Sequence, residues 1–155
     1  MQTVEYWIEQ LQLEGHQEGG YFKQILKSHS SHDGRALYTS IYFLLTSSNP
    51  SHFHRLTADE VWYFHEGSPL TIHMIYPDGR YETIELGKDI EAGQQLQAVV
   101  PKNVIFGSTV EENYALVSCM VSPGFEYEDF ELFNQDELLT DYPEHREIIE
   151  RLTID

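Results

Sequence analysis

The chain has 155 residues, of which 41% are hydrophobic, so it is long enough to bury the core of one ordinary domain, and we expect a single domain over residues 1–155. Twenty-six Asp and Glu residues against nine Lys and Arg residues give a formal net charge of -17. This charge repels nucleic-acid phosphates and anionic lipid headgroups, which argues against nucleic acid and membrane surfaces as partners.

The N-terminal segment and the cysteine content lead us to expect a cytoplasmic protein. The segment MQTVEYWIEQ lacks a basic start and places Glu5 and Glu9 where a signal peptide is apolar. No stretch approaches the roughly 18 apolar residues that a membrane-spanning helix needs. Cys119 is the only cysteine, which excludes an intramolecular disulfide, and its neighbours in ALVSCMV favour burial over a nucleophilic role.

Residues 1–35 predict an N-terminal helix followed by an arm. Thr3 is a suitable N-cap, and the apolar residues of VEYWIEQL, spaced at i, i+3, i+4 and i+7, predict an amphipathic helix that ends at Gly15. The glycine pair of EGGYF predicts a turn into an extended segment. Residues 28–35 are polar and contain glycine, so we expect an exposed loop there.

From residue 36 to residue 132 the pattern changes to short β-rich runs separated by turn signals, which is typical of an antiparallel sandwich or barrel. Ten Tyr and eight Phe residues favour strands over helix interiors. Asp78 and Gly79 in YPDGRY predict a tight hairpin, because such a turn requires positive φ angles. The predicted strands are 37–46, 52–56, 60–66, 70–76, 81–86, 95–100, 104–107, 114–122 and 126–132.

Residues 133–155 predict a helical tail. Pro143 suits the first turn of a helix, and the apolar residues of EIIERL form one edge. Ten of the 26 acidic residues lie between residues 126 and 150. We interpret these acids as a solvated outer face.

The stretch SHFHRLTADEVWYFHEG places titratable side chains in a strand-like context. Residues two apart in a strand share a face, so His52 and His54 are expected to project together. By the same rule Glu60, Trp62 and Phe64 share a face of the next strand. If the two strands pair, two imidazoles and one carboxylate converge. Three such ligands suffice for a divalent metal with an open position.

The same stretch resembles the first motif of the cupin superfamily, G(x)5HxH(x)3–4E(x)6G. His52 and His54 match the histidines of the motif. Glu60 matches the glutamate, and Gly67 follows at the expected distance. The chain departs from the motif in two respects: five residues separate His54 from Glu60, unless Asp59 takes the acidic role, and no glycine precedes His52 at the usual distance.

The second cupin motif supplies the last metal-binding histidine in metal-binding members, and its counterpart here is GQQLQAVVPKNVIFG. Phe106 occupies the position of that histidine, and a phenyl ring cannot bind a metal. The resemblance therefore implies either a metal held weakly by His52, His54 and Glu60 or a pocket that works without metal. Phe106 favours the pocket without metal.

Four segments together are similar to a family of small single-domain cupins of bacteria and fungi: EGGYF, FHRLTADEVWYFHEG, VVP followed by FG, and SPGFEYEDFEL. This resemblance implies a mainly β fold, the double-stranded β-helix or jelly-roll barrel, with short N- and C-terminal helices. It also implies a homodimer that pairs through sheet edges. In fold, such proteins resemble sugar-nucleotide epimerases and plant storage or hormone-binding cupins.

An epimerase-like reaction needs a base, an acid and a carboxylate that orients the base. His54 is the candidate base, because imidazole titrates near neutrality. Glu60 or Asp59 is the candidate for orienting it. The proton donor stays open among three tyrosines, Tyr42, Tyr63 and Tyr114.

Aromatic residues are predicted to line the pocket, because a barrel with one open mouth needs such walls. The candidates are Trp62, Phe64 and Phe106. Arg55 can bind a carboxylate or phosphate of a ligand through its planar guanidinium. Strand alternation aims Arg55 away from His54, however, which favours an ion pair with a nearby acid.

Two residues of the N-terminal arm receive less specific interpretations. His16 lies beside the glycine turn, and we expect a structural role for it. Glu18 can reach a pocket mouth across the turn, but capping or solvation explains it equally well.

The preferred functional hypothesis is a barrel that binds a small polar ligand, sugar-like or carbonyl-containing, and acts as an isomerase or epimerase through His54. One alternative is a small-molecule-binding protein without catalysis. The other is a metal-dependent enzyme that uses His52, His54 and Glu60, with a weakly held divalent metal.

Overall fold

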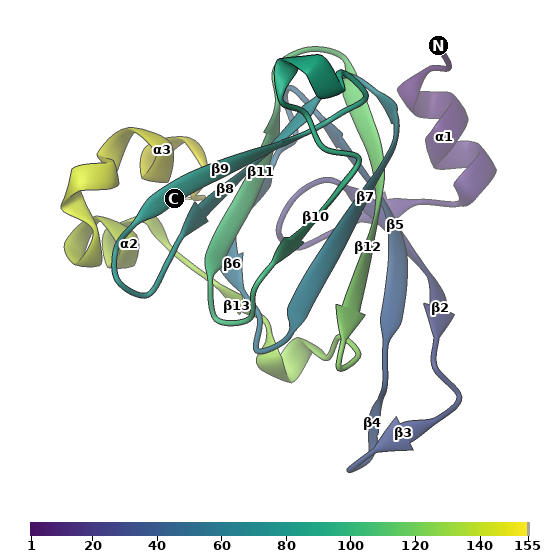
Figure 1. Cartoon of the computed structure of the whole chain (residues 1–155), viewed down its shortest axis with the longest axis horizontal. Helices are drawn as coiled ribbons and strands as arrows, with labels where there is room; N and C mark the ends of the chain where they lie inside the picture. The colour runs from purple at the N-terminus through teal and green to yellow at the C-terminus, as the bar shows by residue number, and fades with distance from the viewer. Residues whose placement is uncertain (155) are drawn as a thin grey trace.

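Two antiparallel sheets lie face to face in the computed structural model, which describes residues 1–154 (Figure 1). The larger sheet has six strands in the order β1-β2-β5-β12-β7-β10, and the smaller has five in the order β13-β6-β11-β8-β9. The six strands are β1 (Glu14–Gly15), β2 (Tyr21–Lys27), β5 (Thr39–Thr46), β12 (Tyr114–Ser122), β7 (Asp59–Gly67) and β10 (Gln97–Val100). The five strands are β13 (Glu131–Leu132), β6 (Ser51–Arg55), β11 (Ile105–Val110), β8 (Leu70–Ile75) and β9 (Tyr81–Leu86). The prediction of a mainly β barrel is confirmed.

The main hydrophobic core fills the space between the two sheets. Strand alternation turns every second side chain inward, so Trp62 and Phe64 of β7 meet Phe43 of β5 and Phe106 of β11. Trp62 is completely buried, and its ring centroid lies 6.0 Å from that of Phe43 and 6.3 Å from that of Phe106. These large rings fill much of the barrel and leave space for a cavity at one end.

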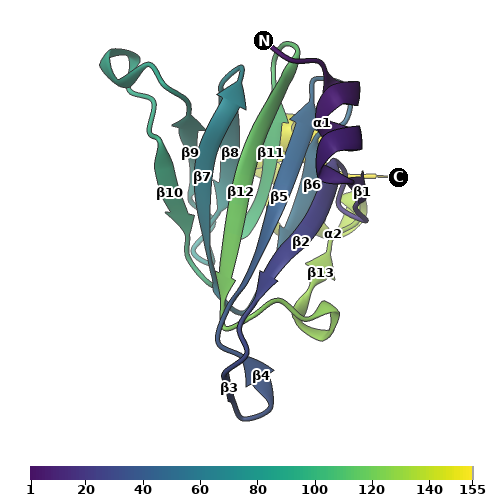
Figure 2. The ribbon, with the colours of Figure 1, turned by 90° about the vertical axis from the view of Figure 1, so that its right-hand side faces the viewer.

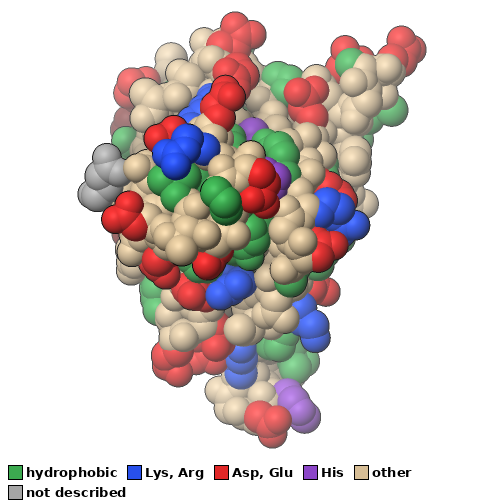
Figure 3. All heavy atoms as spheres, turned by 90° about the vertical axis from the view of Figure 1, so that its left-hand side faces the viewer, with side chains coloured by type: hydrophobic (Ala, Val, Ile, Leu, Met, Phe, Trp, Pro, Cys, Tyr) green, Lys and Arg blue, Asp and Glu red, His purple; other side chains and the backbone are tan. Residues whose placement is uncertain are grey.

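A second apolar cluster joins the C-terminal tail to the outer face of the five-stranded sheet. The tail consists of α2 (Gln135–Asp141), the 3-10 helix η3 (Pro143–His145) and α3 (Arg146–Arg151). Leu138 and Ile149 of these helices pack against Phe53, Ile75 and Ile105 of the sheet. Figure 3 shows acidic side chains spread over this face, and none of the ten acids between residues 126 and 150 is buried. Their prediction as a solvated face is confirmed.

The N-terminal helix α1 (Val4–Leu11) covers the outer face of the six-stranded sheet (Figure 2). Thr3 caps it as predicted, because its hydroxyl oxygen accepts the Tyr6 N–H at 3.1 Å. The helix ends at Leu11 and not at Gly15, since Gln12 adopts a left-handed conformation with φ 57° and its N–H bonds to carbonyls of the last turn. No helix within residues 1–154 has the length and apolarity to span a membrane.

Two further predictions of local structure differ from the observed fold. Residues 28–35 contain a small hairpin of β3 (Ser31–His32) and β4 (Arg35–Ala36), which protrudes from the barrel (Figure 1). The predicted strand 126–132 contains the 3-10 helix η2 (Tyr127–Asp129) and only the two strand residues of β13, and Phe125 and Phe130 beside the helix pack against the core. The extended segment predicted after the glycine pair is β2, which pairs with β5 and widens the sheet.

The YPDG hairpin forms between β8 and β9, but only its glycine has a positive φ, at 89°. Asp78 instead accepts the Arg80 N–H with its side chain at 3.0 Å. The remaining short element, the 3-10 helix η1 (Ile90–Ala92), leads from β9 towards β10.

The packing of the tail leads to a stability prediction. Ile149→Ala should lower the free energy of unfolding by about 2–5 kcal/mol, because it opens a cavity at a completely buried position. The same substitution at Ile90, which is 60% exposed, should change it by less than about 0.5 kcal/mol. Urea denaturation of both variants is the measurement, and equal effects at the two sites would contradict the packing of the tail on the barrel.

Candidate functional site

A cavity of about 280 Å³ lies inside the barrel, at the end where β5 and β7 begin and β6 and β12 end (Figure 1, lower end). Its walls come from strands of both sheets and from the segment after β12. The lining residues are Glu14, His16, Glu18, Phe22, Gln24, Thr39, Ile41, His54, Leu56, Glu60, Cys119, Val121, Phe125 and Tyr127. His54 and Glu60 thus face one shared cavity, as the sequence predicts, but the strand pairing on which that prediction depended is not present: β6 and β7 belong to opposite sheets.

A β-bulge in β6 decides which side chains of that strand face inward. Opposite β11, His54 pairs with Phe106 and Ser51 pairs with Ser108, so β6 has one more residue than its partner between these points. The extra residue brings Ser51 and His54 to the inner face. The two histidines do not share the cavity wall: His54 lines the cavity, whereas the His52 ring contacts the Glu18 carbonyl and is not among the lining residues.

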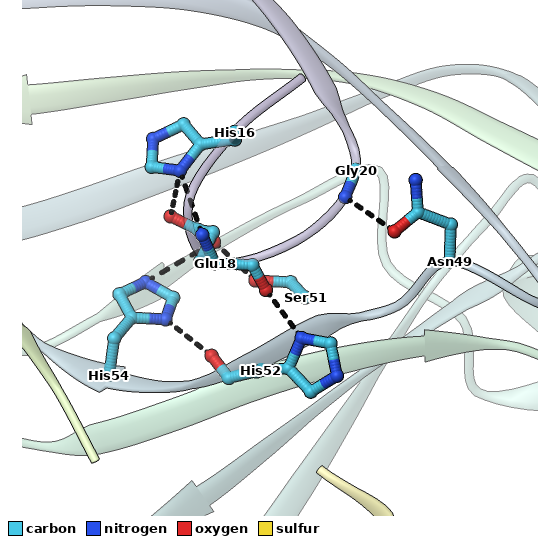
Figure 4. A network of polar contacts seen from close by, with 7 residues as sticks. All are labelled: His16, Glu18, Gly20, Asn49, Ser51, His52 and His54. Carbon is cyan, nitrogen blue, oxygen red and sulfur yellow. Dashed lines mark hydrogen bonds and ion pairs between the residues drawn. The ribbon is translucent and has the colours of Figure 1, made fainter. Parts of the chain in front are cut away.

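Glu18, which the sequence did not clearly assign, is the carboxyl group that contacts His54. Its side chain is buried, and Oε2 lies 3.4 Å from His54 Nε2 (Figure 4). The Ser51 hydroxyl donates a hydrogen bond to the same oxygen. His16 lies on the other side, with its Nδ1 3.5 Å from Glu18 Oε1. The network of His16, Glu18, Ser51 and His54 is the centre of the site.

The glycine turn carries Glu18 to β6. The Glu18 carbonyl accepts hydrogen bonds from the His52 backbone N–H at 2.6 Å and from His52 Nδ1 at 2.8 Å. Gly19 has φ 108°, and a Cβ atom there would lie 2.0 Å from the Pro50 carbonyl oxygen, so only glycine permits this approach. His52 therefore has a structural role: its ring donates a hydrogen bond to the Glu18 carbonyl and fixes the glycine turn against β6.

The hydrogen bonds assign a tautomer to each cavity imidazole. His54 Nδ1 lies 2.8 Å from the His52 carbonyl oxygen, which can only accept, so Nδ1 carries the proton and Nε2 presents its lone pair towards Glu18. In His16 the order is reversed, because Nδ1 accepts the Glu18 backbone N–H at 3.2 Å. The pair of His54 and Glu18 can therefore share one proton between Nε2 and the carboxyl group.

Burial sets the protonation states in the cavity. It lowers the pKa of His54 to about 4 and also lowers the pKa of His16. Burial raises the pKa of Glu18, and the nearby His16 and Ser51 oppose part of this change. Both imidazoles are consequently neutral near pH 7, and His54 can act as a base.

Glu60 enters the cavity from β7, on the same face as Trp62 and Phe64. Its side chain is 8% exposed and forms no ion pair with any Lys, Arg or His among residues 1–154. Burial raises the pKa of Glu60 well above its usual range, and the charge of Glu18 adds to this effect. A protonated Glu60 can donate a hydrogen bond to a ligand in the cavity.

Asp59 and Arg55 lie outside the cavity. Asp59 is exposed, and its Oδ1 accepts the Lys102 backbone N–H at 2.8 Å, so it is not placed to orient His54. Arg55 forms an ion pair with Glu131 at 2.7 Å, which was the use favoured by strand alternation. Its guanidinium also lies 5.1 Å from the centre of the Phe133 ring.

Phe106 packs directly on the candidate base. Its ring centroid lies 4.1 Å from that of His54, and it is 1% exposed. Trp62 and Phe64 belong to the packed core beyond the cavity, and Trp62 Nε1 is buried without a hydrogen-bond partner among the described residues. These three rings shape the barrel interior around the site, whereas the lining aromatic side chains are those of Phe22, Phe125 and Tyr127.

Three tyrosines were candidates for the proton donor: Tyr42, Tyr63 and Tyr114. In the described part of the chain the cavity is lined by Tyr127 and by none of these three. Tyr114 accepts a hydrogen bond from Trp7 Nε1 at 3.0 Å on the outer face of the sheet. Cys119 lines the cavity, but burial raises the pKa of its thiol well above its usual range, so it is not a ready nucleophile.

The predicted metal ligands do not form a metal-binding group. Within residues 1–154 no three His, Cys, Asp or Glu side chains are arranged to hold an ion. His52 does not line the cavity with His54 and Glu60, and its Nδ1 is occupied by a hydrogen bond to the Glu18 carbonyl. Phe106 fills the place where the resemblance expects another ligand. The donor set of His52, His54 and Glu60 does not fit a divalent metal.

Comparison with known proteins identifies the family. The model of the family described as Cupin superfamily (DUF985) matches residues 5–133, and the chain therefore belongs to this family. The uncharacterized protein YML079W of Saccharomyces cerevisiae is 32% identical over 158 residues, which cover 88% of this chain and 78% of the yeast protein.

Solved structures confirm the cupin fold. Protein SO0799 from Shewanella oneidensis is 49% identical, with a TM-score of 0.96 over 99% of both chains. A hypothetical protein from Leishmania major is 40% identical, with a TM-score of 0.95 over 99% of this chain and 100% of the other. Oxalate decarboxylase from Bacillus subtilis, at 13% identity, has a TM-score of 0.61 over 89% of this chain and 36% of its own, a likeness in fold alone.

The buried state of His54 leads to a prediction for NMR. Imidazole ¹⁵N spectra at pH 7 should show a neutral ring with its proton on Nδ1, and titration should occur near pH 4. Because the ordinary pKa of about 6.5 exceeds the folded value, protonation favours the unfolded chain, and His54 lowers the stability as the pH falls from about 6.5 to about 4. A peptide spanning residues 51–67 serves as the unfolded reference. A folded-state midpoint equal to that of the peptide would contradict the assignment.

Proposed function

We propose that the cavity binds a small polar ligand, sugar-like or carbonyl-containing, and that its side chains move a proton on it, as an isomerase or epimerase does. The observation that carries this proposal is the presence of a neutral base, His54, and a high-pKa carboxyl group, Glu60, on the walls of one cavity. Burial favours an unprotonated His54, which can accept a proton, and a protonated Glu60, which can donate a hydrogen bond, at the same pH.

The proposed step uses three groups of the site. The pair of His54 and Glu18 accepts a proton from a carbon next to a carbonyl group, while protonated Glu60 donates a hydrogen bond to the carbonyl oxygen and stabilises the enol or enolate. In an isomerisation the same proton returns to the former carbonyl carbon, while Glu60 gives its proton to the former carbonyl oxygen and takes one from the hydroxyl group of the neighbouring carbon. In an epimerisation a proton from the solvent adds to the opposite face of the original carbon, and the base releases its own proton to the solvent. Glu18 takes the orienting role that the sequence had assigned to Glu60 or Asp59.

The dimensions and walls of the cavity support a small ligand. Its volume of about 280 Å³ lies just below the range of roughly 300–1,000 Å³ for ordinary ligand pockets. Apolar side chains such as Phe22, Ile41 and Val121 alternate with the polar groups. Arg55 is engaged with Glu131 and is not part of this proposed ligand-binding set, whereas Phe106, Trp62 and Phe64 support its floor.

Proton exchange on candidate ligands tests the proposal. Small aldoses, ketoses and hydroxyacetone are incubated with the protein in D₂O, and loss of the carbon-bound proton is followed by ¹H NMR. Wild-type protein should catalyse the exchange on at least one class, and His54→Gln and Glu60→Gln should each slow it by about 10²–10⁴-fold. Glu85→Gln removes a charge from an exposed position on β9 and is the matched control.

If a ligand binds without proton exchange and His54→Gln leaves its affinity unchanged, the alternative of a small-molecule-binding protein without catalysis replaces this proposal. Isothermal titration calorimetry on the same ligands provides that measurement.

We also propose that the protein is a homodimer that pairs along β2. Strand β1 has two residues and pairs only with the start of β2, so residues 23–27 form an open sheet edge (Figure 2). Exposed apolar side chains gather near this edge: Ile25, Leu26, Leu37 and Tyr38.

Light scattering at micromolar concentration tests the dimer. The wild-type protein should have twice the mass of the chain, and the double variant Leu26→Lys, Leu37→Lys should have the mass of one chain, because the charges oppose the contact. Ile90→Lys, at an equally exposed position far from this edge, should remain dimeric. A monomeric wild-type protein would refute the proposal.

A further inference from the structure

The carboxyl groups of the cavity have no cationic side chain beside them in its lining. Three carboxyl groups line it, those of Glu14, Glu18 and Glu60, and no Lys or Arg is among its lining residues. Arg55, which follows His54 in the sequence, forms an ion pair with Glu131 outside the cavity. A negatively charged ligand would therefore enter without a counter-charge, and the net charge of -17 would oppose its approach.

Aromatic side chains line the same cavity as these carboxyl groups. The His16 ring centroid lies 4.6 Å from that of Phe22, 6.4 Å from that of Phe125 and 6.4 Å from that of Tyr127. Phe125 and Tyr127 in turn lie 4.9 Å apart in an edge-on arrangement. Phe22, Phe125 and Tyr127 all line the cavity, so their rings and the neutral His16 form one continuous wall. Aromatic faces attract organic cations, most strongly where water is excluded.

Glu60 is the carboxyl group that lacks a partner of opposite charge. Glu18 has Ser51, His16 and His54 around it, whereas Glu60 is more than nine-tenths buried, faces the cavity and forms no ion pair within residues 1–154. A buried carboxylate is stable only with a proton or a cation beside it. A cationic group of a ligand would supply what the protein itself does not.

We propose that the ligand of this cavity is a small organic cation, an amine-bearing polar molecule of monosaccharide size, whose ammonium group lies between Glu60 and the aromatic wall. The inference rests on the proposed function, because it concerns the ligand of the same cavity. With an amine-bearing ligand Glu60 is the ionised partner of the ammonium group, and the ammonium group takes the place of protonated Glu60 as the donor to the carbonyl oxygen. It narrows that ligand to amine-bearing sugars or carbonyl compounds. It also rejects phosphorylated and nucleotide-linked sugars, which need cationic side chains that this cavity does not have.

The test compares ligands of one shape and three charges. Glucosamine, glucose and glucuronate form one set, and cyclohexylamine, cyclohexanol and cyclohexanecarboxylate form a second, each titrated into the wild-type protein by calorimetry. In at least one set the amine should bind about tenfold or more tightly than the neutral compound, and the carboxylate should bind least. Equal or tighter binding of the neutral or anionic member, or no binding of either amine at millimolar concentration, would overturn the proposal.

Two variants test whether Glu60 causes the preference for the amine over the neutral compound. Glu60→Gln should abolish the difference between amine and neutral compound, while Glu85→Gln should keep it. Thermal unfolding checks that both variants are folded. If Glu60→Gln does not fold, the order of affinities in the wild-type protein alone decides the proposal. Because binding is measured without turnover, a failed proton-exchange assay leaves this result intact, and a wrong order of affinities leaves the exchange assay intact.

Discussion

The buried carboxyl group of Glu18 joins the parts of the chain that build the cavity. A carboxyl group removed from water is costly unless polar partners surround it, and here Ser51, His54 and His16 surround it. The partners come from the glycine turn and from β6, so the side chain and the backbone carbonyl of Glu18 together fasten the N-terminal segment to the five-stranded sheet. Without that contact the base would lose its partner and the cavity would lose a wall.

The bulge in β6 makes this contact possible, and the far end of the chain forms hydrogen bonds with the bulged segment. The Phe53 backbone N–H donates to the Leu152 carbonyl oxygen at 2.8 Å, and the Phe53 carbonyl accepts the Phe133 N–H at 3.2 Å. The Phe53 side chain is buried under the tail helices. The C-terminal tail therefore supports the site, although none of its side chains lines the cavity.

The electrostatics of the cavity follow from burial more than from specific charge pairs. Desolvation lowers the pKa of both imidazoles and raises the pKa of both buried carboxyl groups, so all four groups are shifted towards their uncharged forms. Such a site interacts with a ligand through proton sharing and hydrogen bonds. The site binds a cationic ligand only if one of its carboxyl groups releases a proton and the positive charge of the ligand takes the place of that proton.

Local sequence patterns determined the β-rich barrel, most of its strands, the inward face of β7 with Glu60, and the buried state of Cys119, because alternation and turn chemistry act over a few residues. The motifs also determined the family. Tertiary structure alone decided that His52 contacts the Glu18 carbonyl outside the cavity lining and that the Glu18 side chain becomes the partner of His54. The bulge is a feature of the pairing of β6 with β11, and the bulged segment also bonds to the Leu152 carbonyl; no local pattern encodes partners so far along the chain. In the sequence, only the glycine pair of EGGYF indicated that the chain next to Glu18 could approach another strand closely. That this strand is β6 became clear only from the folded structure.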